Sequence, residues 1–163
     1  MIGNDGLAGI PAILRINISP YKMMTQLPTN ALRIKAEALS NEFNRGGRLH
    51  DLLLGYMHML LTQIAQSVAC NSFHLVEQRL CRWLLISRDR AKTDTLQLTQ
   101  EFLAHMLGVP RTSVTATAGK IQKLGLIRYR RGQIQIIDRQ GLEAAACECY
   151  EVIKEESERF LAA

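Results

Sequence analysis

Apolar residues recur at helical spacing from the middle of the chain to its end, and this pattern predicts a mostly helical protein. The longest predicted helix runs from Arg48 to about Cys70, with leucine and methionine spread over a broad face. At about 1.5 Å per residue it extends about 35 Å. Other helices are predicted over residues 36–44, 75–86, 100–107, 111–124 and 142–161.

The amino-terminal segment has a different pattern, with short runs between glycines and prolines. Residues 21–27 and 31–35 predict two strands around a turn at Pro28-Thr29-Asn30. Two or three strands with an open edge do not form a stable sheet. This segment is therefore expected to belong to something larger or to pack on a partner.

The segment from residue 98 onward has the clearest punctuation. Thr99 suits the N-cap of one helix and Gly108 its end, after which a second helix starts near Pro110. Residues 126–130 and 133–137 then predict two strands with a tight turn at Arg131-Gly132. A helix, a tight turn, a second helix and a hairpin together predict a winged helix-turn-helix. Residues 89–95 before it are polar and predict a loop.

The second helix of this motif leaves a face that suits a DNA groove. With Val114, Ala118 and Ile121 directed inward, the outward face is small, polar and without carboxylates, so it can approach base edges. The residues predicted to contact bases are Arg111, Thr112, Thr115 and Ala116. Those predicted to contact phosphates are Thr99, Gln100, Ser113, Lys120, Arg128, Arg130 and Arg131. A winged helix used only for protein contacts is the alternative.

Charge is distributed unevenly along the 163 residues and supports the DNA hypothesis. Residues 1–72 carry a net charge of +2, residues 73–139 carry +7 and residues 140–163 carry −4. A basic middle segment suits a polyanion. A composition of 47% hydrophobic and 21% charged residues excludes a disordered chain. No run of 18 apolar residues and no signal peptide are present, so a cytoplasmic protein without a membrane partner is expected.

The broad apolar face of the long helix predicts a homodimer, because the flanking sequence offers too little sheet to cover it. The predicted interface consists of Leu49, Leu53, Tyr56, Leu60 and Ile64. The alternative is an ordinary core helix.

The cysteines and histidines give no metal pattern in the sequence. Cys147 and Cys149 are too close for a Cys-x₂-Cys pair, and in a helix such neighbours point to different faces. Cys70 and Cys81 are expected to be buried free thiols. The four histidines (50, 58, 74 and 105) lack ligand spacing, and no catalytic set or phosphate-binding loop is found. We therefore expect no metal, no cofactor and no enzymatic activity.

Three segments, residues 76–85, 98–114 and 124–127, make the chain resemble the Crp/Fnr family of bacterial transcription regulators. The resemblance implies an amino-terminal β-roll similar to cyclic-nucleotide-binding domains, a long dimerisation helix and a winged helix. It predicts an α+β, mostly helical fold with a partial β-roll over 1–44, a dimerisation helix over 45–72 and a DNA-binding domain with a C-terminal helix over 73–163. Its partners would be double-stranded DNA, a second copy of the chain and RNA polymerase.

Departures from the family pattern concern the ligand and the operator. Residues 6–9 resemble the phosphate-cradling turn, but Leu7 replaces the ribose-binding Glu and Ser19-Pro20 the Arg-Ser pair. Cyclic nucleotides are therefore not the expected ligand. Arg111 matches the first arginine that contacts bases in the family. Thr112 stands where the family has an acidic residue that contacts bases, and Ala116 stands where it has a later arginine.

Two alternatives to a homodimeric DNA-binding regulator remain open. The chain could be a protein–protein module that pairs with a full-length relative through the long helix. It could also be a thiol sensor in which oxidation of Cys70 or Cys81 alters the dimer.

Overall fold

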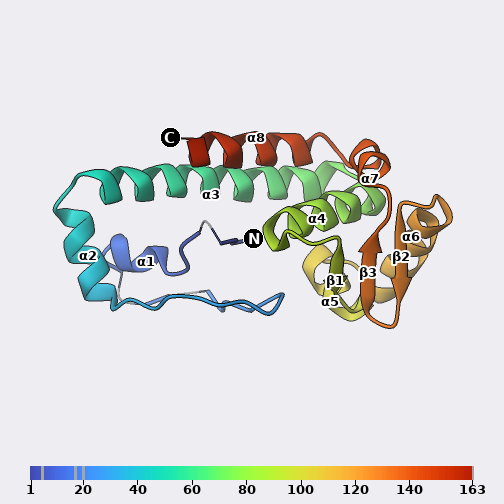
Figure 1. Ribbon diagram of the computed structural model, residues 1–163, viewed down its shortest axis with the longest axis horizontal. Helices are drawn as coiled ribbons and strands as arrows, with labels where there is room; N and C mark the ends of the chain where they lie inside the picture. Colours follow the sequence, from blue (N-terminus) through green and yellow to red (C-terminus); the bar gives the residue numbers. More distant parts are fainter. Residues whose placement is uncertain (5, 17, 20, 163) are drawn as a thin grey trace.

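The computed structural model describes residues 1–4, 6–16, 18–19 and 21–162, and its arrangement is shown in Figure 1. The helices are α1 (Ile10–Ile13), α2 (Ala36–Asn44), α3 (Arg48–Phe73), α4 (Val76–Ala91), α5 (Gln100–Leu107), α6 (Arg111–Lys123), α7 (Arg139–Ala145) and α8 (Cys149–Ala162). The strands are β1 (Thr95–Gln97), β2 (Ile127–Arg130) and β3 (Gln133–Ile136). The predicted α+β, mostly helical class is confirmed.

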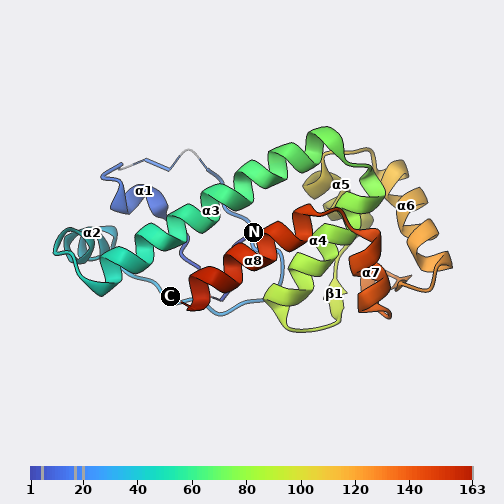
Figure 2. The ribbon, with the colours of Figure 1, turned by 90° about the horizontal axis from the view of Figure 1, so that it is seen from above.

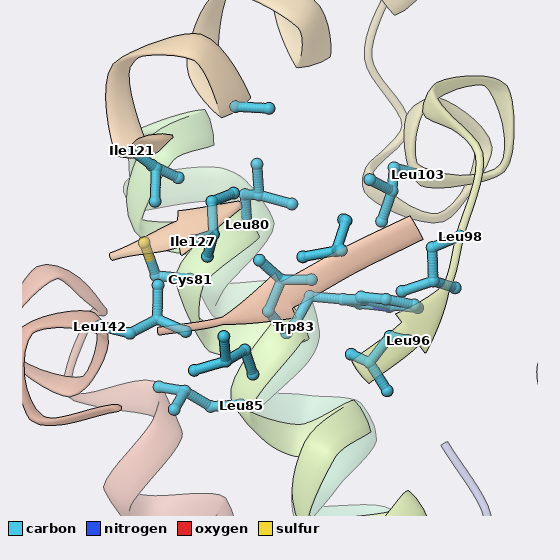
Figure 3. Packing of buried hydrophobic residues seen from close by; sticks show 14 of the residues in the cluster. Leu80, Cys81, Trp83, Leu85, Leu96, Leu98, Leu103, Ile121, Ile127 and Leu142 are labelled. Atoms are coloured by element: carbon cyan, nitrogen blue, oxygen red, sulfur yellow. The ribbon is translucent and has the colours of Figure 1, made fainter. Parts of the chain in front are cut away.

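A single apolar core holds the carboxyl-terminal half together, and Figure 3 shows part of it. Helix α4 lies at its centre, with Leu80, Leu84 and Leu85 completely buried. The Trp83 ring meets Phe102 of α5 edge to face, with 6.1 Å between the ring centroids. This core fixes the helices and strands that carry the predicted DNA contacts.

The sheet is antiparallel, with the strand order β1-β3-β2. Leu96 pairs with Ile134, and Ile127 pairs with Ile136. The turn between β2 and β3 has positive φ at Arg131 (50°) and Gly132 (76°), as a two-residue hairpin requires. The predicted hairpin is confirmed. Strand β1 is not predicted from the sequence, which indicates only a loop over residues 89–95.

The last predicted helix, residues 142–161, is corrected by the structure. The chain forms α7 and α8 with a break at residues 146–148, where Ala146 is extended (ψ 166°). Helix α8 then runs antiparallel to α3 and packs along it (Figures 1 and 2). Phe160 lies against Gly55, and its ring centroid is 5.9 Å from that of Tyr56. The Tyr150 hydroxyl donates to Asp89 Oδ2 of α4 at 2.8 Å.

The two strands predicted over 21–27 and 31–35 are wrong. Residues 21–35 form no strand in the structure. Tyr21, Met23 and Leu32 are exposed, because no neighbouring strand pairs with their backbone. Helices α1 and α2 instead pack on the start of α3 through Ile13, Leu39 and Leu53. Pro20, half of the Ser19-Pro20 pair, lies outside the described residues.

Helix α3 is, among the described residues, long and apolar enough to cross a membrane by length and composition alone. It is also a packed helix of the chain, with Leu53, Tyr56, Met59 and Cys70 buried. A mostly buried core helix passes the same test of length and composition, but only 22% of the apolar window of α3 is buried within the chain.

Candidate nucleic-acid interface

The two helices of the predicted motif are positioned by local signals in the sequence. The Thr99 hydroxyl accepts the backbone N–H of Phe102 at 3.1 Å and caps α5. Gly108 ends that helix in the left-handed region (φ 63°). Pro110 precedes α6, and its carbonyl oxygen accepts the N–H of Ser113 at 3.0 Å. The turn between the helices is therefore as short as the sequence predicts.

Helix α6 buries one face and exposes the other. Val114, Ala118 and Ile121 lie in the core, together with Thr117. All four residues predicted to contact bases, Arg111, Thr112, Thr115 and Ala116, are exposed on the other side. The structure thus leaves these residues on an uncovered helix face.

A polar contact joins the exposed faces of α5 and α6. The Thr115 hydroxyl lies 2.8 Å from Gln100 Oε1 and 3.0 Å from the Arg111 carbonyl oxygen, and either oxygen can accept its hydrogen. Gln100 is half-buried, while Thr99 beside it is exposed. These predicted phosphate and base contacts thus lie next to each other.

No role for Tyr129 of the wing is predicted from the sequence, because an aromatic residue between two arginines does not indicate which residues it will contact. Its hydroxyl donates to the carbonyl oxygen of Leu98 at 3.1 Å. Its backbone N–H donates to Gln122 Oε1 of α6 at 2.6 Å. Burial raises the pKa of its phenol, and the nearby charge of Arg111 opposes that shift. Tyr129 therefore stays neutral and joins the wing to α6 and to the residue before Thr99.

The remaining predicted phosphate contacts surround α6. Arg128, Arg130 and Arg131 are exposed on the wing. The turn of the wing is held beside the start of α5, because the carbonyl oxygen of Gly132 accepts the N–H of Leu98 at 2.7 Å. The predicted contacts Ser113 and Lys120 are half-buried and exposed, respectively.

A carboxylate lies closer to α6 than the sequence indicates. Glu77 Oε2 of α4 is 3.9 Å from the Lys120 ammonium. No acidic residue occurs within α6, but α4 contributes this one from beside it. Binding of a phosphate by Lys120 would have to compete with that ion pair, which is exposed and therefore weak.

The comparisons with known proteins address this same part of the chain. Residues 78–145 match the family model of the Crp-like helix-turn-helix domain. These residues form a Crp-like helix-turn-helix domain. The predicted resemblance to Crp/Fnr regulators is thereby confirmed. No curated protein matches the chain.

Two solved structures share the fold of the Crp-like domain and its surroundings. One is described as a Crp/Fnr-family transcriptional regulator from Eubacterium rectale, with 23% identity, a TM-score of 0.53 and coverage of 68% of this chain and 51% of the other. The second is a Crp/Fnr-family transcriptional regulator from Thermus thermophilus, with 24% identity, a TM-score of 0.53 and coverage of 56% and 50%. The chain thus spans about half the length of these regulators.

The predicted dimer residues divide into two groups. Leu53 and Tyr56 are buried within the chain, Leu53 against Ile13 and Leu39 and Tyr56 through a hydrogen bond from its hydroxyl to the Leu7 carbonyl oxygen (3.1 Å). They are therefore not available to a partner, which corrects the sequence interpretation. The others, Leu49, Leu60 and Ile64, are exposed or half-buried.

The cysteines lie in two different settings. Cys81 is completely buried in the core of the Crp-like domain, and burial raises its pKa to about 12. A thiol that keeps its proton is a poor nucleophile, which argues against oxidation at Cys81 as a sensor. Cys70, Cys147 and Cys149 instead gather around His74, where helix α3 ends and helix α8 begins.

Proposed function

We propose that the chain is a sequence-specific DNA-binding transcription regulator and not an enzyme. The observation that carries the proposal is the exposed face of α6 within a Crp-like helix-turn-helix domain. Arg111 stands at its amino-terminal end, and the wing arginines lie exposed on the neighbouring hairpin. Arg111 would read a guanine, and Arg128, Arg130 and Arg131 would hold the phosphate backbone. Its expected setting is the cytoplasm, and its expected protein partner is RNA polymerase.

The arrangement of charge supports this proposal. The acidic carboxyl-terminal residues form α8, which packs along α3 and away from α6 (Figure 1). Arg139 pairs with Glu143 at 2.9 Å, but the exposed arginines of α6 and the wing are not covered by α8. A polyanion can approach α6 and the wing without meeting α8.

A second copy of the chain would supply a second recognition helix. Along α3, one apolar row at heptad spacing is largely uncovered by the rest of the chain, although Met57 within it packs against the amino-terminal cluster of Ile13, Leu39 and Leu53. It consists of Leu54, Met57, Leu61, Ile64 and Val68. Met57 is half-buried and the other four are exposed, Leu61 at 65% and Val68 at 62%. We name this row the α3 seam and propose that it pairs with the same seam of a second copy, so that two α6 helices reach half-sites about 34 Å apart.

Cyclic nucleotides are not the proposed ligand. The turn over residues 6–9 is occupied by the chain itself, since an added Cβ at Gly6 would lie 2.6 Å from Ile2 Cγ2 and 2.9 Å from the Tyr56 hydroxyl. The Leu7 carbonyl oxygen accepts that same hydroxyl. Calorimetry with cyclic AMP is expected to show no saturable binding, and a one-site isotherm would contradict this part of the proposal.

Selection of bound sites from random DNA tests the proposal most directly. The isolated chain should enrich a two-half-site sequence and bind it at least ~10³-fold more tightly than scrambled DNA. Arg111→Ala should weaken binding to the selected site by about 1–3 kcal/mol and relax the preference at one base pair, with Lys92→Ala as a control of equal charge change. Equal affinity of the wild-type chain for selected and scrambled DNA would reject sequence-specific recognition.

The α3 seam also supports a second candidate function. The chain spans only about half of the solved regulators it resembles, and the exposed seam could pair with a longer relative. A protein of this kind would modulate the relative and would not bind DNA by itself. Failure of the isolated chain to bind any DNA, together with a homogeneous folded state, would favour this candidate.

A further inference from the structure

Four potential metal ligands meet where α3 ends and α8 begins. The ligand atoms of Cys70, His74, Cys147 and Cys149 all lie within 4.8 Å of one another. Cys70 Sγ is 3.5 Å from Cys147 Sγ, and Cys149 Sγ is 3.4 Å from His74 Nδ1. The three cysteines are buried, and the His74 side chain is 18% exposed. All four cysteines of the chain are in the thiol form.

The local fold explains why the sequence pattern conceals this cluster. Cys70 and His74 are four residues apart at the end of α3, so they lie on the same face. Cys147 is in the break before α8, and Cys149 is the first residue of α8. Because residues 147–149 are not the interior of one helix, the two thiols can face the same point. The prediction that Cys147 and Cys149 point to different faces assumes a continuous helix, and the break between α7 and α8 removes that assumption.

We propose that Cys70, His74, Cys147 and Cys149 bind one zinc ion. Three thiolates and one imidazole form a donor set typical of structural, four-coordinate zinc. In a tetrahedral site with Zn–S bonds of about 2.3 Å, neighbouring sulfur atoms are about 3.8 Å apart. The observed separations are close to that value, so a single ion fits with small side-chain movements. Binding would release the three thiol protons.

The orientation of His74 gives independent support. Its Nδ1 faces the thiols, while its Nε2 lies 3.1 Å from Glu148 Oε1. A histidine that binds zinc through one nitrogen usually donates the other N–H to a carboxylate, which fixes the ring and its tautomer. The Glu148–His74 pair reproduces this arrangement. Glu148 Oε1 contacts Nε2, the nitrogen that faces away from the thiols, so Glu148 is not one of the proposed ligands.

The surroundings also compensate the charge of such a site. Zinc with three thiolates and a neutral imidazole carries a net charge of −1. The side-chain amide of Gln66 donates to Cys149 Sγ at 3.1 Å. Burial raises the pKa of the Cys70 thiol, and the charge of the buried Arg82 guanidinium on α4 opposes that shift. Amide donors and a nearby cation stabilise thiolate ligands.

The position of the site defines what the metal would do. Cys70 and His74 precede α4, the first helix of the Crp-like domain, by only a few residues. Cys147 and Cys149 follow α7, the last helix of that domain. One ion would thus connect the entry and exit of the domain at the end of α3. Its proposed role is structural, and it does not depend on the DNA proposal.

Metal titration of the full, reduced chain tests the site. Co²⁺ is the probe for geometry and Zn²⁺ the competitor, with Cys147→Ser and His74→Ala as the cluster variants. Cys81→Ala and His105→Ala are matched controls, because both residues lie outside the cluster. Circular dichroism before titration establishes that each variant is folded, and thermal unfolding with and without Zn²⁺ provides a second readout.

We expect one Co²⁺ per chain, with the intense visible bands of tetrahedral coordination and thiolate charge-transfer absorption, both of which disappear on adding Zn²⁺. The cluster variants should bind at least ~10-fold more weakly, and Zn²⁺ should raise the unfolding temperature of the wild type and controls only. Absence of one-to-one binding, an octahedral spectrum, or equal weakening in the controls would overturn the proposal. So would an iron–sulfur chromophore in anaerobically purified protein, or an oxidised Cys70–Cys147 disulfide that forms equally well with Zn²⁺ present.

Discussion

The side-chain oxygen of Gln122, on α6, accepts the backbone N–H of Tyr129, on β2, at 2.6 Å. This bond fixes the wing relative to the helix proposed to enter the major groove. Gln122 is exposed on α6. Its side-chain oxygen already accepts a hydrogen bond within the protein, so Gln122 would affect DNA binding mainly by holding the wing in place.

Removing this hydrogen bond should show whether Gln122 positions the wing or contacts bases directly. Gln122→Ala leaves the Tyr129 N–H to water and frees the wing to move. We expect specific DNA affinity to fall by about 1 kcal/mol without loss of base preference. Fluorescence anisotropy with the selected duplex and its single-base variants measures both, with Lys123→Ala as the neighbouring control. A changed base preference would instead show that Gln122 reads bases directly.

The wing arginines should act through phosphates. Replacing Arg128, Arg130 and Arg131 by Gln should weaken binding to all sequences. The slope of log affinity against log salt should fall by up to about 0.9 for each phosphate that the wing no longer neutralises. The measurement is a salt series on selected and scrambled DNA. An unchanged slope would mean that the wing does not touch DNA.

The α3 seam should determine the oligomeric state. Leu61→Glu places a charge and its symmetry mate in the proposed interface, where desolvation and repulsion add. We expect the dimer dissociation constant to rise at least ~100-fold and specific DNA affinity to fall more than non-specific affinity. Sedimentation and DNA binding are measured on the same sample.

Two controls sharpen the seam experiment. Leu32→Glu adds the same charge at a fully exposed residue of the amino-terminal segment and should leave the dimer intact. Leu60→Glu tests the seam expected from the sequence, and because Leu60 is half-buried within the chain, its main effect should be on folding. A Leu61→Glu protein that stays dimeric, or a wild-type chain that remains monomeric on DNA, would reject the α3 seam.

Cys81 should make stability depend on pH in the alkaline range. Burial raises its pKa from about 9 to about 12. Above pH 9 the unfolded chain loses this proton while the folded chain keeps it, so the contribution to stability is complete below pH 9 and declines as the pH rises. The decline is at most about 1.4 kcal/mol per pH unit. Urea unfolding at pH 8, 9 and 10 should show a shallower decline for Cys81→Ala, and parallel declines would refute the shift.

The Crp-like domain could be predicted from the sequence because its signals are local. Thr99 caps α5 and Gly108 ends it, and Arg131-Gly132 forms the tight turn of the wing. Each of these depends on the chemistry of one or two residues. Strand β1 could not be predicted because three residues cannot establish an alternating pattern, and its pairing with β3 is a long-range contact.

The amino-terminal strands and the dimer face are predicted less well because both depend on what covers them. The alternating residues 21–27 and 31–35 lack neighbouring strands to pair with, so the pattern alone does not produce a sheet. On α3, the positions of α8 and of the amino-terminal segment together decide which apolar residues are buried, and the sequence pattern reveals neither arrangement. The cluster around His74 is hidden for the same reason, since it joins residues about 75 positions apart.

Helix α8 also limits how the DNA-binding domain can turn. Residues 74–75 form the direct link between α3 and α4, and a single link of that kind would let the domain swing freely. Because α8 leaves the domain beside that link, with Cys149 Sγ 3.4 Å from His74 Nδ1, and then packs along α3, a rotation of the domain must also move α8 relative to α3. The register of α8 on α3 therefore sets the angle of the domain. A shift of one helical turn, about 5.4 Å, would change the distance between the two half-sites that a dimer can span.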